Sequence, residues 1–217
     1  MEFTNKRTML ITASLVLFVA ITQIIYTALY VAEVSFSRQV LWGLEALIFT
    51  VLVAFAGASM VQAKDCQLGW SAIAFSAAIN IIQVSIGLTL FSSFGKVAGA
   101  VEGAQPLIGG VVSLSFMIYY AAKVLLGLAA LVFGMACIAQ GGKMIGGLTA
   151  LAGVVAMFAN GILITFGRDG FLPSGVAGGS GVIATLLLAI CLITLYRKKT
   201  EASSLYFTSE IIFLNKV

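Results

Sequence analysis

The chain has 217 residues, of which 61% are hydrophobic and only 9% are charged, and its mean hydropathy is +1.12. A soluble domain of this size cannot bury so much apolar surface, which excludes the soluble classes and predicts an integral membrane protein. Short strands of alternating polarity are missing, so the expected fold class is all-α and not a barrel. The formal net charge of +4 comes from basic residues beside the apolar runs, so we expect the lipid bilayer, and no nucleic acid, as a partner.

Six apolar runs are long enough to cross a bilayer core of about 30 Å as helices. The first run is too long for the apolar region of a signal peptide, so we expect it to be retained as a helix. A single six-helix transmembrane domain is predicted over residues 1–196, followed by a basic cytoplasmic tail over residues 197–217. The expected spans are residues 8–32, 40–62, 69–94, 107–140, 144–166 and 175–196.

Basic residues are distributed unequally between the two sides of these spans. One side would carry Lys6, Arg7, Lys64, Lys143, Arg197, Lys198, Lys199 and Lys216, and the other Arg38, Lys96 and Arg168. Because basic residues stay on the cytoplasmic side, both termini are predicted to be cytoplasmic. We expect a multi-pass protein of a cell membrane, specifically of a bacterial inner membrane. The cysteines fall near the predicted cytoplasmic ends without paired spacing, as in a reducing compartment.

The links between spans predict how neighbouring helices pair. Residues 92–106, rich in Gly and Ala, are expected to form the longest outer loop. The inner links are very short, which predicts antiparallel hairpins of spans two with three and four with five. These hairpins match weakly at an offset of about 78 residues, either as a parallel repeat or by chance in a small alphabet. The tail after residue 196 fits either a short interfacial helix or a disordered segment.

A lysine, Lys123, lies within the fourth predicted span. A charged side chain at the bilayer centre costs about 2.5 to 3.5 kcal/mol, so such a residue is usually paired, hydrated or functional. Glu45, in the second span, is its expected partner. Tyr119 and Tyr120 precede the lysine by about one helical turn, where each is either a cation–π or hydroxyl partner or a packing residue.

Five strongly polar side chains fall at one depth when residues are counted from the cytoplasmic helix ends. Gln23, Glu45, Gln83, Lys123 and Asn160 lie about 14 to 17 residues up, or roughly 21 to 26 Å at 1.5 Å per residue. We call these five residues with Tyr119 and Tyr120 the polar layer. On a functional interpretation they line an outward-facing cavity for a small polar solute or zwitterion, with Glu45 and Lys123 as its charged floor. On a structural interpretation the charges form a buried ion pair and the amides form interhelical hydrogen bonds worth about 0.6 kcal/mol each.

Catalytic and cofactor signals are weak. The Gly-Gly-Ser-Gly stretch from Gly178 to Gly181 resembles the short motif of intramembrane serine proteases, but the chain has no histidine base. Ser180 with Lys123 is the sole possible dyad, and close packing of a glycine-rich helix is the alternative. A retinal on Lys123 is rejected because a seventh helix and the accompanying carboxylates are missing. Without histidine we expect no cofactor and no metal site. Trp42 and Trp70 are expected to be interfacial anchors.

Three functional classes follow from these observations. The favoured one is a small-solute transporter, channel or ligand-binding membrane protein that uses the polar layer. The first alternative is a non-catalytic accessory or assembly subunit of a membrane complex, and the second is an intramembrane enzyme. We expect a protein without enzymatic activity, whose partners are a small polar solute and either further copies of the chain or another membrane protein.

Overall fold

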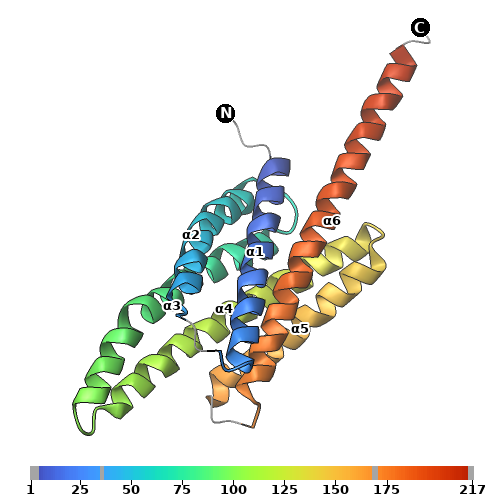
Figure 1. Ribbon diagram of the computed structural model, residues 1–217. Helices are drawn as coiled ribbons and strands as arrows, with labels where there is room; N and C mark the ends of the chain where they lie inside the picture. Colours follow the sequence, from blue (N-terminus) through green and yellow to red (C-terminus); the bar gives the residue numbers. More distant parts are fainter. Residues whose placement is uncertain (1–4, 35–36, 168–170, 215–217) are drawn as a thin grey trace.

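The computed structural model describes residues 5–34, 37–167 and 171–214, with side chains from residue 7 to residue 200 except at positions 30, 31, 174 and 199 and within the gaps. These residues form six helices (Figure 1), each with a stretch long and apolar enough to cross a membrane. The helices are α1 (Asn5–Val31), α2 (Gln39–Gln62), α3 (Gln67–Ala100), α4 (Gln105–Ala139), α5 (Lys143–Phe166) and α6 (Ser174–Leu214). The predictions of an all-α fold and of six such helices are confirmed.

Hydroxyl side chains on the outer faces of the helices form hydrogen bonds within their own helix. Thr50, Ser85 and Thr194 are exposed, and each donates to the carbonyl four residues earlier at 2.7 to 2.9 Å. Because lipid offers no hydrogen-bond partner, a polar group at a lipid-facing position must be satisfied within its own segment. These residues therefore fit an apolar environment despite their polarity.

The hairpin of α3 and α4 is longer than predicted. Its helices have 34 and 35 residues, about 51 to 53 Å at 1.5 Å per residue, against a bilayer core of about 30 Å. The expected outer loop over residues 92–106 is wrong, because α3 continues to Ala100 and α4 begins at Gln105. Pro106 lies in the first turn of α4, where its missing N–H costs nothing, and the Gln105 amide donates to the Ala98 carbonyl at 3.2 Å. The hairpin projects beyond the neighbouring helices (Figure 1).

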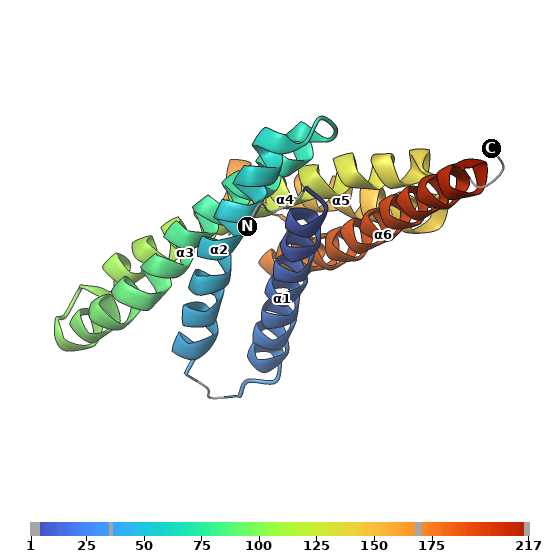
Figure 2. The same ribbon diagram turned by 90° about the horizontal axis from the view of Figure 1, so that it is seen from above.

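Five of the helices form a ring. The helix α1 packs against α2, α2 against α3, and α3 against α4. The helix α6 closes the ring by packing against both α4 and α1. The fifth helix lies outside this ring and packs against α4 and α6. Viewed from above, α1 and α2 stand on the same side of the α3–α4 hairpin (Figure 2).

Glycines form the seam between α4 and α5. A Cβ atom on Gly127 would lie 2.7 Å from the Gly153 carbonyl oxygen, and one on Gly134 would lie 2.7 Å from the Gly146 carbonyl oxygen. Small residues at such positions let helix backbones approach closely and gain dispersion energy and Cα–H···O contacts. This seam explains how α5 is held although it does not belong to the ring.

The last helix does not stop where the tail was expected to begin. It continues to Leu214 and extends beyond the ends of the other helices (Figure 1), so no break separates the sixth span from residues 197–214. Lys198 donates to the Gln140 carbonyl at 2.6 Å and ties α6 to the α4–α5 turn. The proposed parallel repeat fits the helix lengths poorly, since it would pair the 24-residue α2 with the 35-residue α4.

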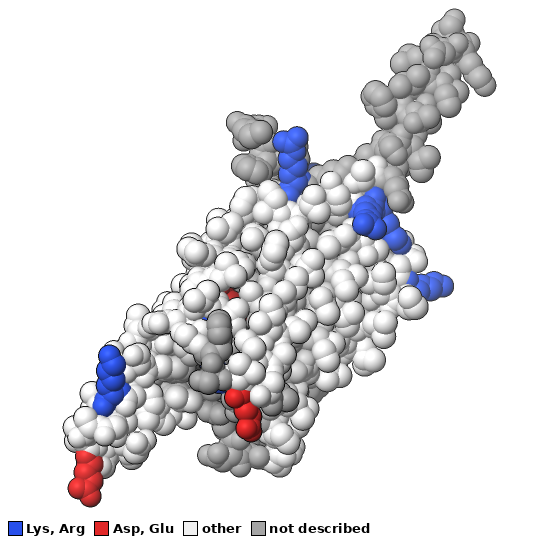
Figure 3. Space-filling view, in the orientation of Figure 1, with Lys and Arg blue, Asp and Glu red and all other residues white. Residues whose placement is uncertain are grey.

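Basic side chains gather at the end of the bundle where α1 begins (Figure 3). Because successive helices run in opposite directions, this end carries five described basic residues, Arg7, Lys64, Lys143, Arg197 and Lys198. The opposite end carries Arg38 and Lys96 beside Glu33 and Glu102. Arg168 and Lys216 lie outside the described residues, and the side chains of Lys6 and Lys199 are not described. The bias that predicted the orientation is therefore present among the described side chains.

One of the two expected tryptophan anchors is buried. Trp70 is only 3% exposed and meets the Phe133 ring edge-on, with the ring centroids 4.8 Å apart. The prediction of an interfacial anchor is wrong for this residue, because Gly69 beside it leaves the space in which the Phe133 ring reaches α3.

Candidate functional site

A cavity of about 410 Å³ lies at the end of the ring that holds the α1–α2 link. All five ring helices line it, and α5 does not. Five residues of the polar layer border it: Gln23, Glu45, Gln83, Tyr119 and Tyr120. Counting residues predicted a common depth for Gln23, Glu45 and Gln83, and the structure shows that these three also converge around one cavity.

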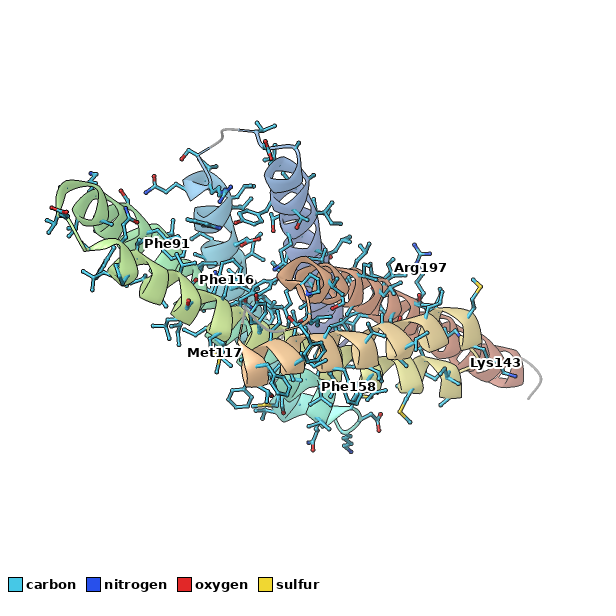
Figure 4. All side chains as sticks on the ribbon, turned by 90° about the horizontal axis from the view of Figure 1, so that it is seen from below. Phe91, Phe116, Met117, Lys143, Phe158 and Arg197 are labelled. Carbon is cyan, nitrogen blue, oxygen red and sulfur yellow. The ribbon has the colours of Figure 1, made fainter. Side chains whose placement is uncertain are left out.

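Aromatic side chains form two walls of this cavity. On one wall Trp42 packs edge-on against Phe91 at 5.5 Å between ring centroids, and Tyr26 lies 6.4 Å from the same indole. Phe116 and the two tyrosines of α4 make the other wall, with centroids 5.8 to 6.4 Å apart. Figure 4 shows Phe91 and Phe116 on the side of the hairpin that faces α2, with Met117 on the opposite side. The middle of the cavity is therefore lined by packed aromatic rings.

Lys123 lies behind the cavity and does not line it. Its side chain is 0% exposed, and its ammonium group donates to Gln23 Oε1 at 2.5 Å and to Thr185 Oγ1 at 3.5 Å. The Tyr119 ring lies 5.2 Å from Nζ, so the ammonium group faces two oxygen acceptors and one aromatic ring. An ammonium group has three N–H donors, and the protein supplies an acceptor for each.

Glu45 reaches the cavity but does not form the expected direct ion pair. The two charged residues interact electrostatically, yet no hydrogen bond or salt bridge joins them among the described side chains. Thr22 donates to Glu45 Oε1 at 2.8 Å, and the same hydroxyl also lies 2.9 Å from the Val19 carbonyl. The pairing failed because depth alone does not fix the rotation of a helix, and rotation decides which side chains touch.

Neighbouring residues of α1 connect the two charges. Thr22 contacts Glu45 on α2, and Gln23 contacts Lys123 on α4, while Thr185 brings α6 to the same lysine. Thr22 and Thr185 were missed from the sequence because threonine is common in membrane helices and carries no charge. Only their positions could have indicated them: Thr22 is next to Gln23, and Thr185 follows Gly181 by one helical turn.

Glycines of α6 provide room for this arrangement. A Cβ atom on Gly181 would lie 2.7 Å from Lys123 Cδ, so this glycine makes space for the lysine stem. Gly175, Gly178 and Gly179 line the cavity. The expected role in close helix packing therefore holds at Gly181, whereas the other three leave open volume.

Two further buried amides lie away from the cavity wall. Asn160, on α5, is 0% exposed and donates to the carbonyls of Ala156 and Ala177 at 2.8 and 3.1 Å. It shares the depth of the polar layer but serves the contact between α5 and α6. Asn80 was missed because it lies below this depth; it donates to the Ser76 carbonyl, while Ser76 donates to Ala122 and holds α3 against α4.

The candidate catalytic dyad is not assembled. Ser180 donates to the Ala177 carbonyl of its own helix at 2.8 Å, and Lys123 donates to Gln23 and Thr185 instead. Within the described ranges, no three His, Cys, Asp or Glu side chains gather closely enough to hold a metal ion.

A second cavity, of about 490 Å³, lies at the opposite end of the same ring. It is bordered by the α2–α3 link and by residues such as Met9, Phe133 and Leu195, again without α5. Buried apolar side chains fill the space inside the ring between the two cavities: Val16, Val19, Leu126, Ala129, Leu188 and Leu192. The ring is thus hollow at both ends and closed in the middle.

Comparison of the chain with protein-family models, with curated proteins and with solved structures finds no match.

Proposed function

We propose that this protein binds a small polar solute within the membrane, as a carrier or solute-binding protein, in a cavity that faces the outside. The single observation that carries the proposal is the cavity of about 410 Å³ at one end of the ring. It holds a carboxylate and two amides between aromatic walls, and a concave apolar pocket with a few convergent polar groups is typical of ligand sites.

The second cavity favours a carrier over an open channel. Both cavities belong to the same five helices, and a packed core separates them. A molecule crossing this ring would need the helices to move, as in alternating access, and could not diffuse through the described conformation. The basic residues at the end with the second cavity support an orientation with both termini in the cytoplasm of a bacterial cell.

Thiol accessibility tests the proposal. In a background with Cys66, Cys137 and Cys191 replaced by alanine, single cysteines replace Gln83 and Gly179 in the cavity wall. Leu47, 69% exposed and expected to face lipid, and the buried Asn160 give control cysteines. A membrane-impermeant methanethiosulfonate added outside intact cells should label the first pair and spare the second, because thiolates form only where water reaches.

The same experiment separates the alternatives. No labelling at either cavity position would contradict the proposal and favour a packed core with a structural role. Labelling of both cavity positions only after permeabilisation would place the cavity on the cytoplasmic side and overturn the orientation. Labelling of the Leu47 control would show that the reagent does not report the cavity.

A second candidate, an accessory or assembly subunit, is favoured by the α3–α4 hairpin. The tip of this hairpin exposes Val97, Val101 and Leu107 by 47 to 55% of their surfaces. An apolar tip on a hairpin longer than the bilayer is suited to a membrane-protein partner or to another copy of the chain. Charged replacements at Val101 and Leu107 should then remove a partner or oligomer in mild detergent and leave cavity labelling unchanged.

A further inference from the structure

The two charges of the polar layer differ in how well the protein satisfies them. Lys123 faces three partners and does not line the cavity, whereas Glu45 does line it. The only described donor to this carboxylate is the Thr22 hydroxyl, whose single proton is shared with the Val19 carbonyl. A carboxylate accepts about four hydrogen bonds when fully satisfied, and burial without them is costly. Glu45 is 7% exposed, so a donor from the cavity would relieve this deficit.

Arg38 lies at the other end of the same cavity. It is the residue before the first turn of α2, exposed, with its guanidinium carbon 5.3 Å from the centroid of the Tyr26 ring. Glu45 follows it by seven positions, so the two lie near one face of α2 about 10.5 Å apart along the helix axis. Trp42 stands between them in sequence and lines the cavity with its indole. Along α2 the cavity wall therefore presents a cation, an aromatic surface and an anion in that order.

The charges that line the cavity restrict the ligand further. Among the described lining residues the charged ones are Glu45 and Arg38, which contribute −1 and +1. A simple cation would be repelled by Arg38, and a simple anion would leave the carboxylate without a further donor. A molecule with both charges can satisfy both ends at once.

We infer that the ligand is an extended zwitterion, with its ammonium group on Glu45, an apolar middle against Trp42 and Phe116, and its anionic group at Arg38. An ω-amino acid or a short peptide has this chemistry, whereas an α-amino acid is too short to reach both groups. The ammonium group also meets the faces of aromatic rings, which attract cations. The inference rests on the proposed function, because it needs a cavity that water can enter.

Protection of a cavity cysteine tests the inference. The probes are glycine, ω-aminobutanoate, ω-aminohexanoate and ω-aminooctanoate, with hexylamine and hexanoate as single-charge controls of matched length. Each is added to the Gln83→Cys protein in intact cells before the methanethiosulfonate. We expect the two longest zwitterions to slow labelling at least threefold, and glycine and both single-charge controls to have little effect.

Variants then assign the two ends. Glu45→Gln should abolish protection by ω-aminohexanoate, and Glu45→Asp should retain part of it, since it keeps the carboxylate. Arg38→Gln should reduce protection by ω-aminohexanoate to the level of hexylamine. Arg38 lies outside the helix, so this variant remains a test if Glu45→Gln does not fold, as judged by size-exclusion chromatography.

The outcomes are distinguishable from those of the proposed function. If the cysteine labels but no zwitterion protects it, or if hexylamine protects as well as ω-aminohexanoate, the ligand class is wrong and the solute cavity stands. Protection that survives in Glu45→Gln also overturns the inference. If the cysteine does not label at all, the proposed function itself fails.

Discussion

A buried lysine in this membrane protein is held chiefly by neutral side chains. Gln23 supplies the short hydrogen bond, Thr185 a longer one and Tyr119 an aromatic face. The neighbouring carboxylate acts only through space. Such an arrangement keeps the lysine fixed while leaving Glu45 available to the cavity.

The contribution of the Gln23–Lys123 hydrogen bond to stability can be measured by comparing variants of two glutamines. Gln23→Leu should lower the free energy of unfolding by about 1.5 to 3 kcal/mol, because it leaves a buried ammonium N–H without an acceptor. Gln83→Leu is the matched control: its amide donates to the neutral Ser115 hydroxyl at 3.2 Å, a bond worth about 0.6 kcal/mol. Unfolding in mixed detergent micelles gives both values. Equal losses would show that the charge adds nothing to the Gln23 contact.

Two glycines of α6 should respond oppositely to alanine. In Gly181→Ala the new Cβ atom would clash with the Lys123 stem at 2.7 Å, and we expect a loss of about 1 to 3 kcal/mol from overpacking. Gly179→Ala meets nothing within 4 Å and should be neutral or stabilising by up to about 1 kcal/mol, as for glycine in a helix. Thermal melts of the two purified variants check this. Similar melting temperatures would mean that the lysine stem moves aside freely.

Sequence reasoning found most residues of the site but not their contacts. Counting at 1.5 Å per residue gives the height of a side chain, which is why Gln23, Glu45 and Gln83 were placed together. The direction in which each helix turns its side chains depends on packing against neighbours. The ion pair of Glu45 with Lys123 and the inclusion of Asn160 therefore failed, although both rested on correct depths.

At the scale of the element, the seam of α4 with α5 depends on missing side chains. Gly134→Ala would place a Cβ atom 2.6 Å from the backbone nitrogen of Ala150, where only movement of α5 as a whole can relieve the clash. We expect a loss of at least about 1 to 3 kcal/mol in the free energy of unfolding. Gly161→Ala, on the partner helix α5 and with nothing within 4 Å of the new Cβ atom, is the control. A stable Gly134→Ala protein would show that the seam is looser than described.

Helices were predictable as elements because each contains an apolar run that must satisfy its backbone internally in lipid. The ends of the helices were harder to predict where a helix extends beyond the length that a bilayer requires. Residues 92–106 are small and partly polar, a composition shared by loops and by helix extensions outside the bilayer. Contact with the facing helix decides between the two, and that contact cannot be read from either segment alone. The same reason applies to α6 beyond Tyr196.

At the scale of the whole molecule, the ring explains why a chain of only six helices can hold two cavities. Placing α5 outside leaves five helices around a wider axis than four helices would enclose. The aromatic walls and the glycines of α6 line the cavity at the end with the α1–α2 link, while apolar side chains close the middle. The proposed carrier function needs relative movement of the ring helices, and α1, which contacts both charges, is the element best placed to couple that movement to ligand binding.

The orientation of this ring decides which cavity meets the outside, and two matched acidic residues test it. Glu102, in the α3–α4 turn, and Asp65, in the α2–α3 link, are both exposed and lie at opposite ends of the bundle. Acidic residues contribute little to topology, so cysteine at either position should leave the orientation unchanged. With five described basic residues at one end and two at the other, we expect an impermeant thiol reagent to label Glu102→Cys in intact cells. Asp65→Cys should react only after permeabilisation. The reverse pattern would place Glu45 and its cavity on the cytoplasmic side, and ligand protection would then have to be measured in inside-out vesicles.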